Sequence, residues 1–180
     1  MKKAAIVIAF KEFRDEEYFY PKEILESNGI KIDTFSNESG LAIGRFGGEA
    51  KSKNLDDLDI NDYDAIIFVG GSGAIRFLDN EKSYDLIKKA ENKNKIIAAI
   101  CIAPIILAKA GVLKNKKAVA WSSSLDKSSI EIIKKNQGIY EENQVVVDGN
   151  IITGKDYEAA KLFGQTISSL LKQKDINEKN

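Results

Sequence analysis

Cys101 is the only cysteine of the chain, and its surroundings are those of a nucleophile in an α/β protein. An apolar run, residues 95–100, leads into it, and Pro104 and a helix-like stretch, residues 105–110, follow it. A strand that ends in a reactive side chain and turns directly into a helix is a nucleophile elbow. We expect this turn to expose the sulfur at the positive end of a helix, which favours the thiolate. The sequence contains no histidine, so any chemistry at Cys101 proceeds without an imidazole.

Two other segments that could carry chemistry also follow expected strands. Residues 70–73 read Gly-Gly-Ser-Gly, and residues 14–17 read Arg-Asp-Glu-Glu. Because open α/β sheets bind ligands at the carboxyl ends of their strands, these segments and Cys101 should lie together. The small residues leave backbone N–H groups free to form an oxyanion hole. They do not have the pattern of a phosphate-binding loop, and we expect neither a cofactor nor a metal.

Each candidate also has a plainer interpretation. A single cysteine is most often a small buried hydrophobe, and the glycines could simply permit a tight turn. Glu16 and Glu17 could do no more than favour the first turn of a helix. The aromatic residues 18–20 are expected to pack in the core or at an interface. Trp121 is expected to pack as well, or to line the mouth of a pocket.

The composition is that of an ordinary soluble protein. The 180 residues are 43% hydrophobic and 30% charged, and 27 Lys and Arg balance 27 Asp and Glu. The zero net charge argues against nucleic acid or an anionic membrane as a main partner. The longest apolar run, residues 96–108, is too short to span a bilayer. With a single cysteine and no targeting segment, we expect a cytoplasmic protein.

We expect one domain over residues 1–172 and a polar tail over residues 173–180. Strand and helix patterns alternate, which is typical of a mostly parallel sheet with helices on both faces. The expected strands are residues 4–9, 30–35, 64–69, 96–100 and 117–121. The expected helices are residues 15–28, 81–92, 105–110, 128–136 and 157–172. Hairpins are expected within residues 36–60 and 145–153.

Several side chains have expected roles in these helices. Asp15 should cap the first helix, and Ser128 or Ser129 the fourth, because their side chains can accept hydrogen bonds from free N–H groups. Pro21 should kink the first helix or confine that helix to an early turn. Leu162 belongs to the apolar stripe of the last helix.

The three candidate segments together resemble the PfpI superfamily. Residues 15–21, 69–74 and 99–104 read DEEYFYP, VGGSGA and AICIAP, in the order and spacing of that superfamily. Further matches extend the likeness to nearly the whole chain: residues 44–48, 62–64, 110–114 and 148–153. The superfamily groups PfpI-like intracellular proteases with the Parkinson-disease protein deglycase, and it is related to class I glutamine amidotransferases. The resemblance implies a flavodoxin-like three-layer α/β sandwich that is usually a homodimer or larger.

The resemblance also implies roles for individual residues. Cys101 would be the nucleophile and Glu17 its carboxyl partner, with Glu16 as the alternative if the alignment slips by one residue. Backbone N–H donors beside the sulfur would come from Gly70, Gly71 and Ile102. The pocket would be lined by Glu16, Ser72 and Trp121.

The chain departs from the superfamily in lacking histidine. Protease-like members have a histidine directly after the cysteine, where this chain has Ile102. Deglycase-like members often have one near the position of Trp121 or Ser122. A Cys–His dyad is therefore impossible within the chain and across a homodimer, which argues against peptidase or amidase activity by the usual triad.

A thiol and a carboxyl suffice for a different reaction. A thiolate nearby and burial should both raise the pKa of Glu17, so that this residue could act as general acid and base near neutral pH. We therefore expect a stress-related protein that acts on a small reactive carbonyl such as methylglyoxal, or on a glycated substrate, like a glyoxalase or deglycase. Two alternatives stay open: a redox-sensing or chaperone-like protein without catalysis, and a cysteine-dependent peptidase or amidase.

Overall fold

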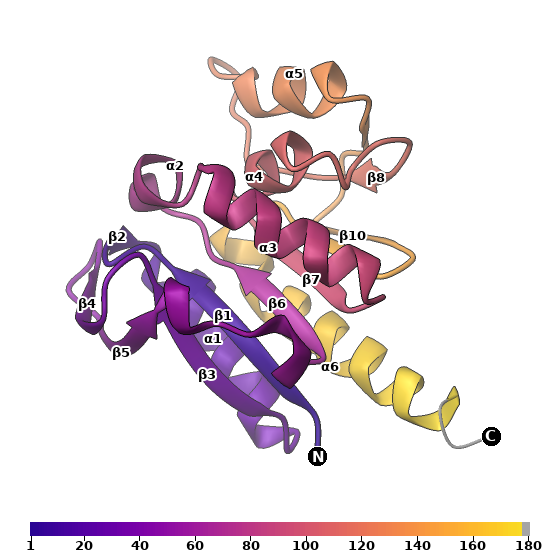
Figure 1. Ribbon diagram of the computed structural model, residues 1–180. Helices are drawn as coiled ribbons and strands as arrows, with labels where there is room; N and C mark the ends of the chain where they lie inside the picture. Colours follow the sequence, from indigo (N-terminus) through magenta and orange to yellow (C-terminus); the bar gives the residue numbers. More distant parts are fainter. Residues whose placement is uncertain (178–180) are drawn as a thin grey trace.

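The computed structural model describes residues 1–177 and contains a nine-stranded sheet in the order β10-β11-β7-β6-β1-β3-β5-β4-β2 (Figure 1). The strands are β1 (Lys3–Ile8), β2 (Lys11–Phe13), β3 (Lys31–Ser36), β4 (Gly40–Gly44), β5 (Glu49–Asn54), β6 (Ala65–Phe68), β7 (Ile96–Ile100), β10 (Val145–Asp148) and β11 (Ile151–Gly154). The central strands β3, β1, β6, β7 and β11 are parallel to one another. The prediction of a mostly parallel, flavodoxin-like α/β sheet is confirmed.

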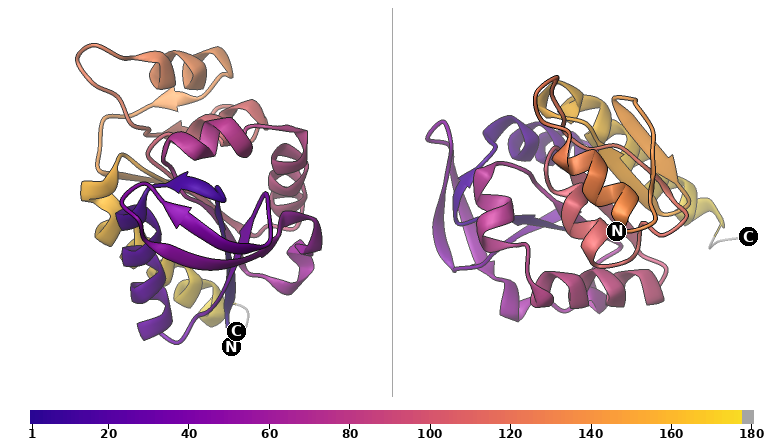
Figure 2. Two further views of the ribbon diagram at one scale, coloured as in Figure 1. Left: turned by 90° about the vertical axis from the view of Figure 1, so that its left-hand side faces the viewer. Right: turned by 90° about the horizontal axis from the view of Figure 1, so that it is seen from above.

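Helices cover both faces of the sheet. The helices of the described residues are α1 (Asp15–Ser27), α2 (Ser72–Phe77), α3 (Glu81–Asn92), α4 (Pro104–Lys109), α5 (Ser128–Lys135) and α6 (Ala160–Asn177), with short 3-10 turns η1 (Leu55–Asp57), η2 (Ile60–Asp62) and η3 (Tyr157–Ala159). Helices α1 and α6 lie side by side on one face (Figure 2). Helices α3 and α4 cover the other face.

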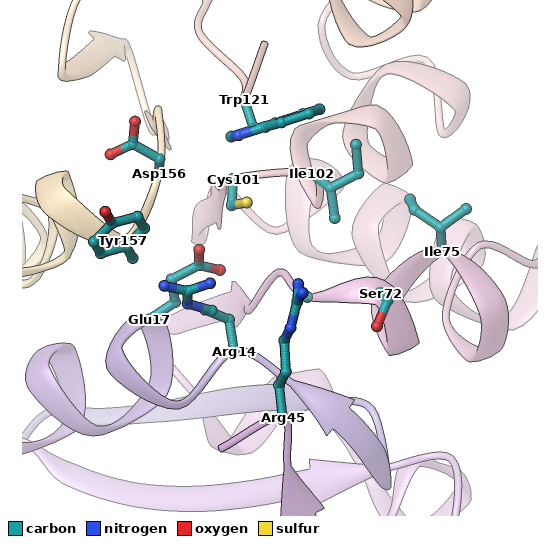
Figure 3. A pocket seen from close by; sticks show the side chains of 11 residues that line it. Arg14, Glu17, Arg45, Ser72, Ile75, Cys101, Ile102, Trp121, Asp156 and Tyr157 are labelled. Carbon is teal, nitrogen blue, oxygen red and sulfur yellow. The ribbon is translucent and has the colours of Figure 1, made fainter. Parts of the chain in front are cut away.

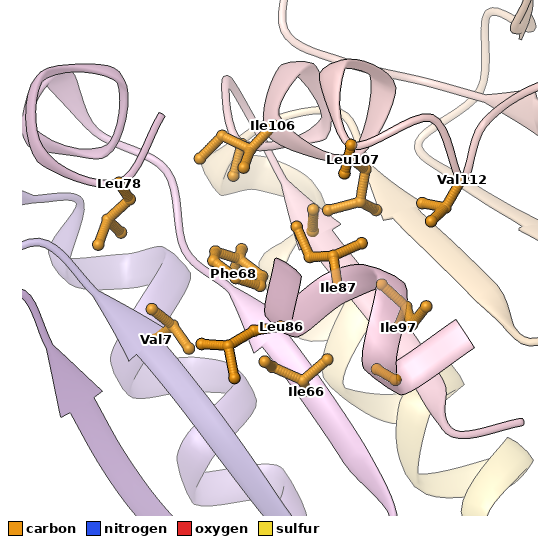
Figure 4. Packing of buried hydrophobic residues seen from close by; sticks show 14 of the residues in the cluster. Val7, Ile66, Phe68, Leu78, Leu86, Ile87, Ile97, Ile106, Leu107 and Val112 are labelled. Atoms are coloured by element: carbon orange, nitrogen blue, oxygen red, sulfur yellow. The ribbon is translucent and has the colours of Figure 1, made fainter. Parts of the chain in front are cut away.

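Two apolar clusters fill the spaces between the sheet and these helices. Along β1, Ala5 and Val7 belong to one cluster and Ile6 and Ile8 to the other, because successive side chains of a strand point to opposite faces. The first cluster includes Val7, Phe68, Ile87, Ile106 and Leu107 (Figure 4). Burial on both faces explains why the central strands are continuously apolar in sequence.

The contact between α1 and α6 depends on a glycine. Helix α1 continues through Pro21 to Ser27, well beyond an early turn. A Cβ added at Gly164 of α6 would lie 2.8 Å from the Cα of Pro21. Only a residue without a side chain allows this close approach. The packing of α6 therefore fixes the position of α1, whose first turn carries Glu17.

Both expected hairpins are present. Strands β4 and β5 are antiparallel and cover residues 40–54. Strands β10 and β11 are antiparallel as well, and Gly149 in their turn has a φ of 62°. The Gly149–Asn150 turn therefore has, at Gly149, the positive φ that the sequence predicts.

The expected strand over residues 117–121 is shorter than predicted. Only β8 (Lys117–Ala118) is extended and paired, and its partner is the unpredicted strand β9 (Ile139–Tyr140) in a separate two-stranded sheet. The pairing ends because the N–H of Val119 donates to Thr153 Oγ1 and that of Trp121 to the carbonyl of Cys101. Because these N–H groups donate to other parts of the fold, they cannot form hydrogen bonds with a neighbouring strand.

The predicted helix caps were wrong. Arg14, not Asp15, occupies the N-cap position of α1, and the Asp15 carboxylate accepts hydrogen bonds from the turn between β4 and β5. At α5 the N-cap position is Lys127. The carboxylate of Asp126 accepts the N–H of Ser128 at 2.9 Å, so neither Ser128 nor Ser129 caps that helix.

Helices α6 and α2 also differ from expectation. Leu162 is 43% exposed, so it does not belong to the buried stripe of α6. Helix α6 extends to Asn177, into the segment that the sequence indicates as a polar tail. The rest of that segment, residues 178–180, lies outside the described residues. Helix α2, directly after the diglycine, was not predicted because the six residues from Ser72 to Phe77 are too few to show a helical period.

Candidate active site

Cys101 adopts the backbone conformation of a nucleophile elbow. It follows β7 directly and has a φ of 64°, in the left-handed region that side chains other than glycine rarely adopt. Its N–H donates to the carbonyl of Gly154 at 2.9 Å, and its carbonyl accepts the N–H of Trp121 at 2.8 Å. These bonds hold a strained residue in place, and strain of this kind is concentrated at functional sites.

Glu17 is the carboxyl that lies beside the sulfur. It is buried, with 1% of its surface exposed, although it sits in the first turn of a helix. Its Oε2 accepts the N–H of Gly70 at 3.1 Å. Its Oε1 is buried and has no hydrogen-bond partner among residues 1–177. The carboxyl and the Cys101 thiol lie close enough for each to shift the pKa of the other.

Gly70 makes room for this pair. A Cβ added at Gly70 would lie 2.5 Å from Glu17 Oε2 and 2.7 Å from the Cβ of Cys101. Gly70 was expected to offer its N–H to the sulfur side of the site, but that N–H is engaged by Glu17. The first glycine of the diglycine therefore brings acid and thiol together, and it does not contribute to an oxyanion hole.

Two backbone N–H groups do lie at the sulfur. Those of Gly71 and Ile102 hydrogen-bond to it and act to lower the pKa of the thiol. Gly71 has a φ of 100°, and an added Cβ would lie 2.5 Å from the carbonyl oxygen of Glu12. The second glycine is needed for its conformation, and this conformation points an N–H at the reactive atom.

The ionisation of the pair differs from the sequence-based expectation of a thiolate. Burial, followed by the neighbouring Glu17, raises the pKa of the Cys101 thiol above its usual range. Burial also raises the pKa of Glu17, from 4.5 to about 7, whereas the interaction with the Cys101 thiol lowers it, contrary to the expectation that the sulfur would raise it. The short helix α4 begins at Pro104, and the N–H groups at the sulfur do not outweigh desolvation. Near neutral pH these shifts favour the thiol form of Cys101 beside a carboxyl that can take up or release a proton.

A pocket of about 440 Å³ opens over the pair (Figure 3). It is lined by Arg14, Glu17, Arg45, Gly71, Ser72, Ile75, Cys101, Ile102, Trp121, Asp156 and Tyr157. Ser72 and Trp121 thus lie where the sequence placed them. Glu16 does not line the pocket, because its carboxylate pairs with the Arg14 guanidinium at 2.8 Å. Of the two neighbouring carboxyls, Glu17 is the one brought to Cys101.

Five lining residues were not identified from the sequence: Arg14, Arg45, Ile75, Asp156 and Tyr157. Arg14 belongs to a segment that was examined only for its carboxylates. Arg45 stands in a glycine-rich turn, and the glycines were the only sequence signal for a close approach of this turn to the site. Among residues 1–177, no group of three or more His, Cys, Asp or Glu side chains is arranged to hold a metal ion.

The fold and this site define an α/β protein with a cysteine at a nucleophile elbow and a buried carboxyl partner. The sequence profile of the DJ-1/PfpI family matches residues 2–170, and the chain belongs to this family. The resemblance noted in the sequence is thereby confirmed.

Individual relatives agree with this assignment. An uncharacterised protein of Methanocaldococcus jannaschii is 45% identical over 164 residues, which are 90% of this chain and 78% of the relative. Deglycase PfpI of Pyrococcus furiosus is 31% identical over 152 residues, which are 83% of this chain and 88% of that protein. The crystal structure of a ThiJ/PfpI domain protein from Brachyspira murdochii has a TM-score of 0.89 at 28% identity, covering 95% of this chain and 96% of that one. No helix within residues 1–177 is long and apolar enough to cross a membrane.

Proposed function

We propose that this protein converts small reactive carbonyl compounds, free or as early adducts, through addition of Cys101 with Glu17 as the proton-transfer group. The observation that carries the proposal is that the buried carboxyl of Glu17 lies beside the Cys101 thiol and keeps one oxygen, Oε1, without a hydrogen-bond partner among residues 1–177. A carboxyl with a pKa of about 7 can both accept and release a proton near neutral pH. It supplies the function that an imidazole has in most cysteine enzymes. The name deglycase of the Pyrococcus furiosus relative is consistent with this substrate class.

The first step forms a hemithioacetal. As the sulfur bonds to the aldehyde carbon of a 2-oxoaldehyde, the thiol proton passes to the Glu17 carboxylate. The carbonyl π electrons move to the oxygen, which then takes this proton from Glu17. Donors at that oxygen would be the N–H groups of Gly71 and Ile102, which lie at the sulfur.

The next steps isomerise and release the product. The Glu17 carboxylate removes the hydrogen of the hemithioacetal carbon, which leaves an enediolate. The hydroxyl on that carbon passes its proton to the neighbouring oxygen, and Glu17 returns its proton to the neighbouring carbon. This internal redox change leaves a thioester of a 2-hydroxy acid on Cys101. Water attacks the thioester carbon, the C–S bond breaks, and the sulfur recovers its proton. The sum is a 2-oxoaldehyde plus water giving a 2-hydroxy acid, so no external oxidant or reductant is needed.

Lactate formation from methylglyoxal tests this proposal. Wild type should form lactate, whereas Cys101→Ser should abolish formation and Glu17→Gln should slow it by about 10²-fold or more, as expected when a general acid–base group is removed. Glu23→Gln, at an exposed position of the same helix, is the matched control and should behave as wild type. Wild-type turnover no faster than that of Cys101→Ser would end the proposal.

Redox sensing is the second candidate, because a protonated Glu17 could donate to a sulfinate on Cys101. The raised pKa of the thiol disfavours it, since the thiolate is the form that peroxide oxidises. Intact-mass measurement after mild peroxide treatment separates the two. A discrete gain of two oxygens at Cys101, in a protein without turnover, would favour the sensor.

A further inference from the structure

The pocket contains a cation that the proposed reaction does not use. Arg45 lies in the turn between β4 and β5, exposed to solvent, and its side chain is directed from this hairpin toward Cys101 and Ser72 (Figure 3). Its backbone N–H donates to the carbonyl of Phe13 at 2.8 Å. The turn is therefore held against the site by its own backbone, and Arg45 is not the tip of a free loop.

Asp15 provides the second anchor of this turn. Its carboxylate accepts the N–H of Phe46 at 2.9 Å and that of Gly48 at 2.7 Å. A Cβ added at Gly44 or Gly48 would lie 2.6 or 2.4 Å from the carboxylate oxygens of Asp15. The two glycines let the turn close around the carboxylate. Because Asp15 and Glu17 share the first turn of α1, the hairpin and the catalytic carboxyl are positioned together.

The other charged groups of the pocket are already paired or engaged. The Arg14 guanidinium hydrogen-bonds to Glu16 and stacks over the rings of Tyr157, at 4.3 Å, and Phe46, at 4.8 Å. The Asp156 carboxylate accepts backbone N–H groups of the 3-10 turn η3.

Arg45 differs from both of these groups. Among residues 1–177 no carboxylate forms an ion pair with it, and its only ring contact is with Phe46 at 5.9 Å. Four charged or ionisable groups thus belong to the lining of the pocket: Arg14 with Glu16 outside it, Asp156, the Glu17–Cys101 pair, and Arg45. The Glu12 carboxylate does not line the pocket and accepts the hydroxyl of Ser72 at 3.2 Å. Only Arg45 offers a cation without a counterion.

We propose that Arg45 binds an anionic group of the substrate, so that the preferred substrates are small carbonyl compounds carrying a carboxylate or a phosphate. This inference rests on the proposed function, whose substrate class it narrows. A guanidinium presents a planar fork of N–H donors that matches either anion bidentately. A pocket of about 440 Å³ accommodates such a molecule with its reactive carbon at Cys101 and its anionic end at Arg45.

Two alkylating reagents that differ in charge test the anion-binding role of Arg45 without relying on turnover. Iodoacetate is anionic and iodoacetamide is neutral, and both form an S–CH₂ bond with Cys101 while iodide leaves and the thiol proton is lost. Cys101 is the only cysteine, so intact mass reports its labelling directly. The measured quantity is the ratio of the iodoacetate rate to the iodoacetamide rate.

In Arg45→Met this ratio should fall about tenfold relative to wild type, which corresponds to roughly 1.4 kcal/mol. Arg45→Lys should retain part of the ratio because it keeps the charge but loses the fork. Arg76→Met is the matched control, since it removes an exposed arginine that does not line the pocket, and its ratio should equal that of wild type. An unchanged ratio in Arg45→Met would overturn the anionic subsite and leave the proposed function standing. Failure of both reagents to label wild-type Cys101 would overturn the proposed function and the subsite together.

Competition identifies the anion. Acetate and inorganic phosphate are added separately during labelling by iodoacetamide. The anion that slows labelling of wild type, but not of Arg45→Met, names the substrate group as carboxylate or phosphate. If neither anion slows labelling of wild type, the subsite is refuted.

Discussion

The buried carboxyl of Glu17 makes a prediction about stability whose size follows from the structure. Burial raises its pKa from 4.5 to about 7. The folded protein binds this proton more tightly than the unfolded chain, so the stabilising contribution is complete below pH 4.5 and is lost as pH rises through 7. A rise of this size corresponds to roughly 3 kcal/mol of unfolding free energy. Glu17→Gln removes the ionisation but keeps an oxygen that can accept the N–H of Gly70.

Urea denaturation of wild type and Glu17→Gln, from below pH 4.5 to above pH 7, measures this contribution. The free energy of unfolding of the variant, minus that of wild type, should increase by roughly 3 kcal/mol across the window. Glu23→Gln, exposed on the same helix, should show a constant difference from wild type. A constant difference for Glu17→Gln as well would mean that burial does not perturb this carboxyl, and the reasoning about the acid–thiol pair would be refuted.

Three further substitutions test the elbow, the diglycine and the hairpin anchor. Cys101→Gly should be more stable than Cys101→Ala by about 1 kcal/mol, because only glycine adopts the φ of 64° without strain; equal urea midpoints would contradict this. Gly70→Ala should cost about 1 to 3 kcal/mol through overpacking and should abolish lactate formation; an unchanged melting temperature would show that the site has room for a methyl group. Asp15→Ala should cost about 1 to 3 kcal/mol and speed amide hydrogen exchange at Phe46, whose N–H it accepts; unaltered exchange at that amide would exclude the anchor.

Much of the sheet could be predicted from the sequence because its central strands are buried on both sides. Residues 96–100 are apolar throughout, and all five are buried in the structure. The helix over residues 81–92 was predicted with the bounds that the structure has. The strand predicted over residues 117–121 was too long, because two N–H groups in this segment donate to Thr153 and Cys101, which are distant in sequence. Local pattern cannot show such competition for backbone donors.

The candidate site was predictable to the extent that it lies at strand ends. Cys101 directly follows β7, and Glu17 lies in the first helical turn after β2. Open α/β sheets place their sites at such strand ends. The charge state was wrong because it depends on burial, and burial of the thiol is decided by the packing of separate segments around it. Arg45 was missed for a similar reason, since the contacts of the β4–β5 turn with the Phe13 carbonyl and the Asp15 carboxylate bring it to the pocket.

The close approach of Gly164 to Pro21 has a consequence for the order in which the molecule becomes reactive. Helix α6 follows every strand of the sheet in the chain, so it leaves the ribosome after Cys101 and the diglycine have been synthesised. Until then, α1 lacks the surface that packs opposite Pro21, and its acidic first turn is held only by its contacts with the preceding strands and turns, such as that of Glu17 with the N–H of Gly70. A nascent polypeptide therefore lacks one of the supports of the acid–thiol pair until helix α6 has been translated.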